Sequence, residues 1–195
     1  MNSYSQAGQD LLALSLLKHK PLPKTFLDLG CNDPLHNNNT YLLEQNGWQG
    51  LSVDLQDFQT QYALHRHTPF LKADLITLDW PAILNYYPSL LTLDYLSFDV
   101  DNATLKAFQN FPFNLIHFHV LTIEHDAYRV GPTTRKILRS TLSTLGYTLL
   151  CADVTLSGFG EFEDWWVDDR VVDPILVNKV RSSGKNCLDI CAALC

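Results

Sequence analysis

Short apolar runs that end at a carboxylate recur along this chain. They occupy residues 25–30, 50–54, 69–73, 95–100 and 114–124. The clearest, TFLDLG, GLSVD and YLSFDV, reach an aspartate at or near their last position. Continuous apolar runs of this length are typical of parallel strands that are buried on both faces. We therefore predict a parallel sheet with acidic residues where its strands end.

Segments with helical features separate these runs. They occupy residues 41–47, 57–66, 79 onward, 103–110 and 133–145. Gly47 is placed to close the first with a left-handed C-cap, and Asp79 with Pro81 is a typical helix start. Because strands and helices alternate from residue 25 to 152, we predict one doubly wound α/β domain of the Rossmann-like type. Its ligand crevice lies beyond the carboxyl ends of the strands.

The two ends of the chain extend this pattern. We expect an amphipathic helix over 6–17, a sixth strand over 147–152 and an extended segment over 162–167. Residues 171–180 could add a last strand, which Pro174 limits to a sheet edge. The domain then covers residues 1–180, and 181–195 form a tail. Its cysteines are spaced by four: Cys187, Cys191 and Cys195. We expect this tail to be poorly ordered or packed against a partner.

Composition limits the possible classes of protein. The chain has 195 residues with 46% hydrophobic content, which suits a single packed domain. Its formal net charge of −7 gives no basic surface for nucleic acid. It lacks an apolar run of about 18 residues, so we predict no membrane span. The N-terminus lacks the pattern of a signal peptide, and the odd number of cysteines does not suit a disulfide framework; both indicate a cytoplasmic protein.

The strand–helix–strand unit at 26–55 favours nucleoside binding. Asp54 lies about 20 residues past the first turn, where an acid can accept hydrogen bonds from both ribose hydroxyls. The first turn has Gly30, but Asn32 and Pro34 stand where a pyrophosphate-binding motif needs glycine. S-adenosylmethionine therefore fits better than NAD. The alternative is a buried unit whose acids are simply solvated at the strand ends.

Five motifs in this order resemble those of FkbM-type methyltransferases. They are SQAGQD (5–10), DLGCNDP (28–34) with NNTYLLEQNGWQGLSVD (38–54), LDYLSFDVDN (93–102), IEHDAYR (123–129) and FEDWWV (162–167). This is a class I, S-adenosylmethionine-dependent family whose characterised members mostly methylate hydroxyl groups. The chain departs from the family at Asn102 and Ala103, where a glycine and an acid are common, and at Asp54, where many members have glutamate.

The resemblance implies a set of donor-binding residues. Those in and after the first strand are Asp28, Gly30, Asn32, Asp33, Thr40 and Asp54, and Asp74 with Leu75 follows the third strand, where an acid commonly meets the adenine amino group. Gln6 and Gln9 belong to a segment that lies against the cofactor in the family. The alternatives are helix capping by Ser5 for that segment and a solvated loop acid for Asp74.

The acidic residues after the fourth and fifth strands are candidates for catalysis. Asp99 and Asp101, with Glu124, could hold a divalent cation such as Mg²⁺. Alternatively Asp99 acts as a general base, and Asp101 caps the helix that follows. His125 can accept a hydroxyl proton near neutral pH, and Glu124 could orient it. We therefore assign catalysis to His125, Asp99 and Glu124.

Other polar residues divide between the acceptor and the core. Asp101 and Asp126 follow strand ends, and the resemblance places Asp164 and Trp165 near the substrate mouth. His117 and His119 share one strand face well before its end, so we predict structural histidines beneath a helix rather than metal ligands.

The predicted function is methyl transfer from S-adenosylmethionine to a hydroxyl of a small molecule or sugar. The contrasting hypothesis is a non-catalytic module that keeps the fold and binds a nucleoside or a protein partner, which the change at Asn102 and Ala103 favours. The sequence indicates neither the acceptor nor the oligomeric state.

Overall fold

The computed structural model describes residues 2–181 and 184–194. Within them, seven strands form one sheet in the order β3-β2-β1-β4-β5-β7-β6. The strands are β1 (Thr25–Leu29), β2 (Gln49–Asp54), β3 (Phe70–Lys72), β4 (Thr92–Phe98), β5 (His117–Glu124), β6 (Thr148–Leu156) and β7 (Phe159–Val167). The first five strands are parallel and β7 is antiparallel to both its neighbours. The predicted doubly wound, mostly parallel α/β fold is confirmed.

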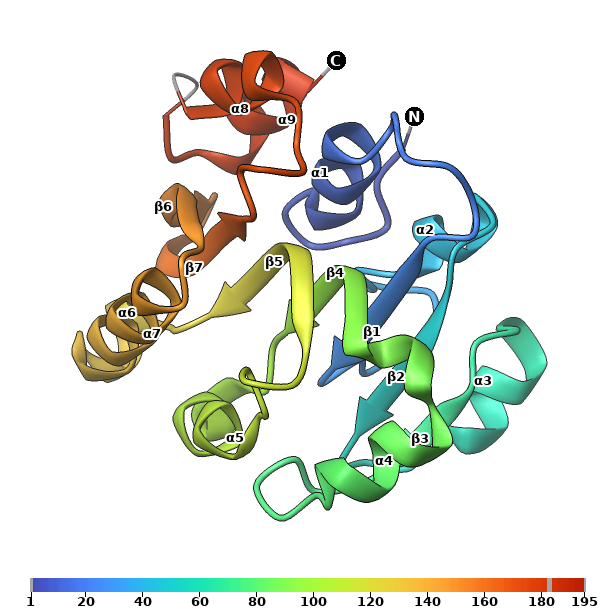
Figure 1. The fold of residues 1–195 in the computed structure, drawn as a ribbon. Coiled ribbons are helices and arrows are strands. Elements are labelled where there is room, and N and C mark those ends of the chain that lie inside the picture. Colours follow the sequence, from blue (N-terminus) through green and yellow to red (C-terminus); the bar gives the residue numbers. More distant parts are fainter. Residues whose placement is uncertain (1, 182–183, 195) are drawn as a thin grey trace.

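Helices cover both faces of this sheet (Figure 1). The α-helices are α1 (Gln9–Leu16), α2 (Tyr41–Gln45), α3 (Gln59–His65), α4 (Trp80–Tyr86), α5 (Thr104–Asn110), α6 (Ala127–Val130), α7 (Thr133–Thr144), α8 (Pro174–Arg181) and α9 (Cys187–Leu194). Two short 3₁₀ helices, η1 (Pro88–Leu91) and η2 (Asp101–Ala103), flank β4. As predicted, Asp79 caps α4 by accepting the Ala82 N–H.

The core has two layers because successive strand side chains point to opposite faces. Leu29, Val53 and Phe98 pack with α4, α5 and α7 on one face. Phe26, Tyr95 and Val120 pack with α1, α2, α8 and α9 on the other. Burying each such side chain contributes about 1.5–3 kcal/mol.

Strand register aligns one residue from each central strand at the carboxyl edge. Leu29 pairs with Val53 and with Phe98, and Phe98 pairs with Ile123. The next residues therefore lie in one row across four adjacent strands: Asp54, Gly30, Asp99 and Glu124. The sequence expectation that acids gather at this edge is met for these strands.

At the chain ends, one predicted helix is confirmed with a later start and one predicted strand is wrong. Helix α1 begins at Gln9 rather than at residue 6, with Gly8 in the left-handed region before it. Residues 171–180 contribute helix α8 instead of an edge strand. Asp173 begins that helix, since its carboxylate accepts the Ile175 N–H and its carbonyl accepts the Val177 N–H. Proline is tolerated at a first helical position, where its missing N–H costs nothing.

The C-terminal segment packs on its own chain, which corrects the expectation of a poorly ordered tail. Helix α9 contacts α1, α8 and β6, and Cys187 and Ile190 are buried. The Cys191 thiol lies 3.7 Å from the Ala7 carbonyl, and Cys195 lies outside the described residues. No helix in the described ranges is long and apolar enough to cross a membrane.

Candidate active site

A cavity of about 530 Å³ opens at the carboxyl edge of the sheet. Ten of the residues that the sequence predicts for the site line this cavity: Gln6, Gly30, Asn32, Asp54, Asp74, Leu75, Asp99, Asp101, Glu124 and Asp126. Small-molecule sites usually measure about 300–1,000 Å³. The sequence therefore located ten of the residues that line a ligand-sized cavity.

One end of the cavity is built on the turn after β1. Gly30 has φ of 81°, and a Cβ there would lie 1.7 Å from the Asp99 carbonyl oxygen, so a side chain cannot fit at this point. Asp54 accepts the Asn32 N–H at 2.9 Å and the Gln56 N–H at 2.8 Å, one on each carboxylate oxygen. Each oxygen keeps a lone pair for a ligand hydroxyl. We call the part lined by Gly30, Asn32, Asp54, Asp74 and Leu75 the donor end.

Asp74 and Leu75 form the far wall of the donor end. The Asp74 carboxylate accepts the Ile76 N–H at 2.9 Å, which fixes the turn. Asn110 of α5 donates to the Leu75 carbonyl at 3.0 Å. An apolar side chain beside a fixed carboxylate suits a flat heterocycle that carries an amino group.

A row of buried polar side chains lies two residues before the row of Asp54, Gly30, Asp99 and Glu124. Asp28 pairs in register with Ser52 and Ser97, and Ser97 pairs with Thr122. The predicted residues Asp28 and Thr40 belong to this layer and do not line the cavity: the Thr40 hydroxyl donates to Asp28 at 2.8 Å. Burial raises the pKa of the Asp28 carboxyl. Their place in the structure is support beneath the first turn.

The other end, the acceptor end, is lined by Asp99, Asp101, Glu124, Asp126, Tyr128, Arg129 and Phe162. The carboxyl groups of Asp99 and Glu124 are neighbours, and Glu124 Oε2 is buried without a hydrogen-bond partner among the described residues. Neighbouring carboxyls favour holding one proton between them, because two ionised carboxylates repel each other and offer no donor. Burial raises the pKa of both carboxyls, and the repulsion of neighbouring acids raises it further. The pair can therefore both release and accept a proton near neutral pH.

A third group of acids lies at the mouth of the acceptor end. Carboxylate oxygens of Asp101, Glu124 and Asp126 lie within 4.8 Å of one another, an arrangement that could ligate a cation. Arg129 already hydrogen-bonds Asp126 and lies 3.6 Å from Asp101. Its guanidinium supplies positive charge at the place where a metal would bind. The exposed Asp101 does not cap η2 or α5 with its side chain.

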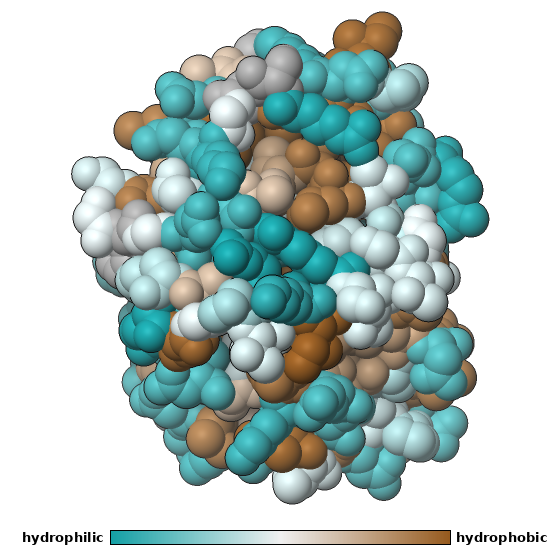
Figure 2. Space-filling model, turned by 90° about the vertical axis from the view of Figure 1, so that its left-hand side faces the viewer, coloured by the Kyte–Doolittle hydropathy of each residue, from teal (hydrophilic) through white to brown (hydrophobic). Residues whose placement is uncertain are grey.

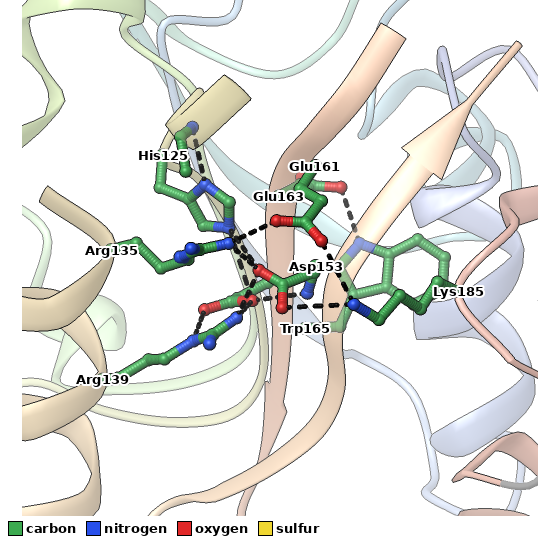
Figure 3. Close-up of polar contacts among 10 residues, drawn as sticks. His125, Arg135, Arg139, Asp153, Glu161, Glu163, Trp165 and Lys185 are labelled. Atoms are coloured by element: carbon green, nitrogen blue, oxygen red, sulfur yellow. Dashed lines mark hydrogen bonds and ion pairs between the residues drawn. The ribbon is translucent and has the colours of Figure 1, made fainter. Parts of the chain in front are cut away.

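His125 does not line the cavity, and its ring points toward Asp153 (Figure 3). Its side chain is wholly buried, Nδ1 accepts the Ala127 N–H at 3.1 Å, and Nε2 lies 3.4 Å from Asp164 Oδ1. The structure therefore does not place this ring where it could contact an acceptor, because the turn after β5 directs it beneath the sheet edge. Asp164 and Trp165 are also fully buried and lie outside the cavity lining.

Two further predicted residues lie off the cavity. Gln9 is buried, and its amide donates to Glu163 at 3.0 Å while its oxygen accepts the Ala7 N–H at 2.8 Å. Asp33 is on the surface and accepts the N–H groups of Leu35 and His36. Gln9 thus shapes the segment that brings Gln6 to the cavity, whereas Asp33 closes a turn.

Sequence reasoning missed several site residues. Tyr128, Arg129 and Phe162 line the acceptor end. Glu163 is fully buried beneath it, where burial raises the pKa of its carboxyl to about 8, and Trp165 Nε1 donates to it at 2.6 Å. Tyr128 and Arg129 had a signal, since they continue the predicted turn after Asp126. Glu163 had none, because an acid at a strand position reads as solvent-facing.

Comparison with known proteins gives a fold match. Neither a protein-family model nor a curated protein matches the sequence. A TehB-like SAM-dependent methyltransferase from Corynebacterium glutamicum superposes with a TM-score of 0.55 over 85% of this chain and 89% of its own, at 15% identity. The chain has the fold of S-adenosylmethionine-dependent methyltransferases.

Two further structures show how broad this fold group is. A Burkholderia thailandensis 1,6-didemethyltoxoflavin-N1-methyltransferase, solved with its substrate and S-adenosylhomocysteine, matches with a TM-score of 0.50 and 13% identity over 83% of this chain and 79% of its own. A putative rRNA-methylase from Clostridium thermocellum matches with a TM-score of 0.52 and 12% identity over 86% and 97%. At these identities the likeness shows the fold alone.

Proposed function

We propose that this chain is an S-adenosylmethionine-dependent O-methyltransferase of the FkbM type, acting on a hydroxyl of a small molecule or sugar. The observation that carries the proposal is the edge row of Asp54, Gly30, Asp99 and Glu124. This row sets a nucleoside-sized donor end beside a carboxyl pair that can take up a proton.

The donor end suits the adenosyl group of the cofactor. Asp54 keeps acceptor capacity on both oxygens for ribose hydroxyls, and Asp74 with Leu75 offers one carboxylate and one apolar wall for adenine. Gly30 keeps the first turn free of a side chain. When bound, S-adenosylmethionine supplies an electrophilic methyl group on its sulfonium.

The residues of the acceptor end would orient a hydroxyl and accept its proton. Holding donor and acceptor in contact while water is excluded accounts for much of the rate gain in such displacements. The Asp99 and Glu124 pair would take the hydroxyl proton as the new C–O bond forms. This assigns the base to the carboxyl pair, and not to His125, because the pair lines the cavity.

A small acceptor is preferred over nucleic acid. Arg129 is the basic residue among those that line the cavity, and it is paired with Asp126. The other charged lining residues are Asp54, Asp74, Asp99, Asp101, Glu124 and Asp126. A phosphate backbone would be repelled by this lining and by the net charge of −7.

The first test is calorimetric titration with S-adenosylmethionine, S-adenosylhomocysteine and NAD, with and without magnesium. We expect micromolar binding of the two adenosyl compounds and none of NAD. Asp54→Ala should weaken S-adenosylhomocysteine roughly 10- to 100-fold, the effect of losing charge-assisted hydrogen bonds. Asp57→Ala is the matched control, since this exposed aspartate pairs with Lys72 outside the cavity lining.

Absence of adenosyl binding would overturn the proposal and favour the non-catalytic module. Tighter binding with magnesium, lost in Asp101→Asn, would support the predicted cation. A panel of sugars and small alcohols, followed by release of S-adenosylhomocysteine, then identifies the acceptor. Asp99→Asn should lower turnover at least tenfold while leaving cofactor affinity within a few-fold.

A further inference from the structure

The turn that follows β5 supplies much of the acceptor end. Its cavity-lining side chains are Glu124, Asp126, Tyr128 and Arg129. The Phe162 carbonyl of β7 accepts the N–H groups of His125 at 2.7 Å and Asp126 at 2.9 Å. Asp126 has φ of 47°, a left-handed conformation that a non-glycine residue keeps only when its surroundings hold it.

The His125 imidazole supplies part of that support from below. Nδ1 accepts the Ala127 N–H, the first amide of α6 after the left-handed residue. A nitrogen that accepts carries no proton, so the neutral ring has its proton on Nε2. That proton faces Asp164, whose nearer oxygen is 3.4 Å away. The ring therefore spans from the turn to a fixed anion.

Asp164 is held firmly by α7. Arg139 donates to its two oxygens, each at 2.7 Å, and the Asp153 N–H donates to one of them at 2.8 Å. Burial raises the pKa of Asp164, but the hydrogen bonds from Arg139 and from the Asp153 N–H outweigh it, and the pKa is lowered. This carboxylate is a rigid, ionised anchor for the imidazole.

The other charged groups around the ring balance one another when Asp164 is counted with them (Figure 3). They are Asp153 on β6, Glu161 on β7, Arg135 and Arg139 on α7, and Lys185 before α9. His125, Asp153 and Asp164 have the spacing of a metal site. Because guanidinium groups already bind both carboxylates, the cluster has its positive charge without a metal. On the outside, a band of hydrophilic side chains crosses this face of the molecule (Figure 2).

We propose that His125 is a positioning residue of the methyl-transfer site. By joining the Ala127 N–H to Asp164, its ring keeps Glu124 and Asp126 directed into the cavity, without itself touching either substrate. The inference rests on the proposed function. It adds a residue through which the charged groups around Asp164 hold the turn that lines the acceptor end. It predicts that the two ring nitrogens have separable roles.

The first experiment reads the tautomer. Protein labelled with ¹⁵N at histidine gives ring signals for its seven histidines, and the signal absent from His125→Asn identifies His125. We expect a protonated Nε2 and an unprotonated Nδ1. The reverse tautomer would overturn the inference, because Nδ1 could not then accept the Ala127 N–H.

The second experiment compares His125→Asn with His125→Phe. Asparagine places an amide oxygen near Nδ1 and can still accept the Ala127 N–H, whereas phenylalanine cannot. We expect slow exchange of the Ala127 amide in the wild type and in His125→Asn, and exchange at least tenfold faster in His125→Phe. With an acceptor from the panel, kcat should fall less than threefold in His125→Asn and more than tenfold in His125→Phe.

Controls separate this inference from the proposed function. His117→Asn changes a histidine at the start of β5 that lies outside the cavity lining, and it should leave Ala127 exchange unchanged. All variants should bind S-adenosylhomocysteine within threefold of the wild type, since the donor end does not include this turn. A folded His125→Phe protein with a protected Ala127 amide and full kcat would overturn the positioning role. If the wild-type protein bound neither S-adenosylmethionine nor S-adenosylhomocysteine, that result would instead count against the proposed function.

Discussion

The amino and carboxyl edges of the sheet both carry carboxylates, but the charges of these carboxylates are balanced differently. At the amino edge, Asp94 pairs with Lys20 and lies 3.1 Å from His119 Nδ1. At the carboxyl edge, no ion pair joins Asp99 or Glu124 to a basic residue of residues 2–181 and 184–194. The same residue type is thus used in two electrostatic settings within one sheet.

The pKa shifts follow this difference. Although burial raises it, hydrogen bonds from His119 and Lys20 lower the pKa of Asp94 to about 2. Burial raises the pKa of Asp99 and Glu124, and the neighbouring acids raise it further. Ionised Asp94 therefore stabilises the fold, whereas the carboxyl edge keeps acids together at a cost in stability. Functional sites commonly bear such a cost.

The largest expected difference comes from removing one carboxylate at each edge. Asp94→Ala leaves the Thr25 N–H without its acceptor and Lys20 without its carboxylate partner, and we expect a loss of roughly 3 kcal/mol in the free energy of unfolding. Asp99→Ala removes repulsion and should cost less than about 1 kcal/mol. Urea unfolding of both variants measures this. Equal losses would contradict the comparison.

Acid sensitivity is the next expected effect. The folded pKa of Asp94, about 2, lies below its usual 3.8, so its stabilisation is present above pH 3.8 and is lost as the pH falls toward 2. The contribution is on the order of 2 kcal/mol. Urea midpoints measured from about pH 5 to pH 2 should fall more steeply for the wild type than for Asp94→Asn. If the urea midpoints of the two proteins fell in parallel, Asp94 would not be the cause of the loss of stability in acid.

The sequence predicted the carboxyl edge better than the amino edge. Acids at strand ends are visible as a pattern, and parallel register brings them together, so Asp54, Asp99 and Glu124 could be placed without coordinates. His117 and His119, predicted to be structural, have acidic partners: His117 Nε2 lies 3.0 Å from Asp168, and His119 contacts Asp94. Their partners could not be predicted, because Asp168 and Lys20 come from distant segments.

Side-chain direction within turns was the weakest part of the prediction. Glu124, His125 and Asp126 are consecutive, yet the ring of His125 points beneath the edge while its neighbours line the cavity. That outcome depends on the left-handed Asp126 and on the Phe162 carbonyl, which is 36 residues away in sequence. Residues 171–180 show a related limit of prediction from sequence. An apolar run with an internal proline is compatible both with an edge strand and with the start of a helix.

Glu124→Gln tests the carboxyl edge through its pH dependence. In the wild type the folded pKa of Glu124 lies above its usual value, so the stabilisation from its bound proton is complete at low pH and is lost as the pH rises through that raised pKa. Glutamine does not titrate and can donate to Asp99. We expect a flatter profile from roughly pH 5 to pH 8 and a gain of about 1 kcal/mol near pH 8. A steeper profile would contradict the shared proton.

The smallest expected effect comes from Arg170→Ala at the amino edge. Arg170 hydrogen-bonds Asp168 through Nε at 2.8 Å, but its side chain is 72% exposed. Exposed ion pairs contribute little because water and salt screen them, and Asp168 keeps His117 as a partner at 3.0 Å. The urea midpoint should therefore move by little more than the error of measurement. A shift as large as that of Asp94→Ala would mean that the carboxylates at the amino edge are stabilised by surface cations rather than by their buried contacts.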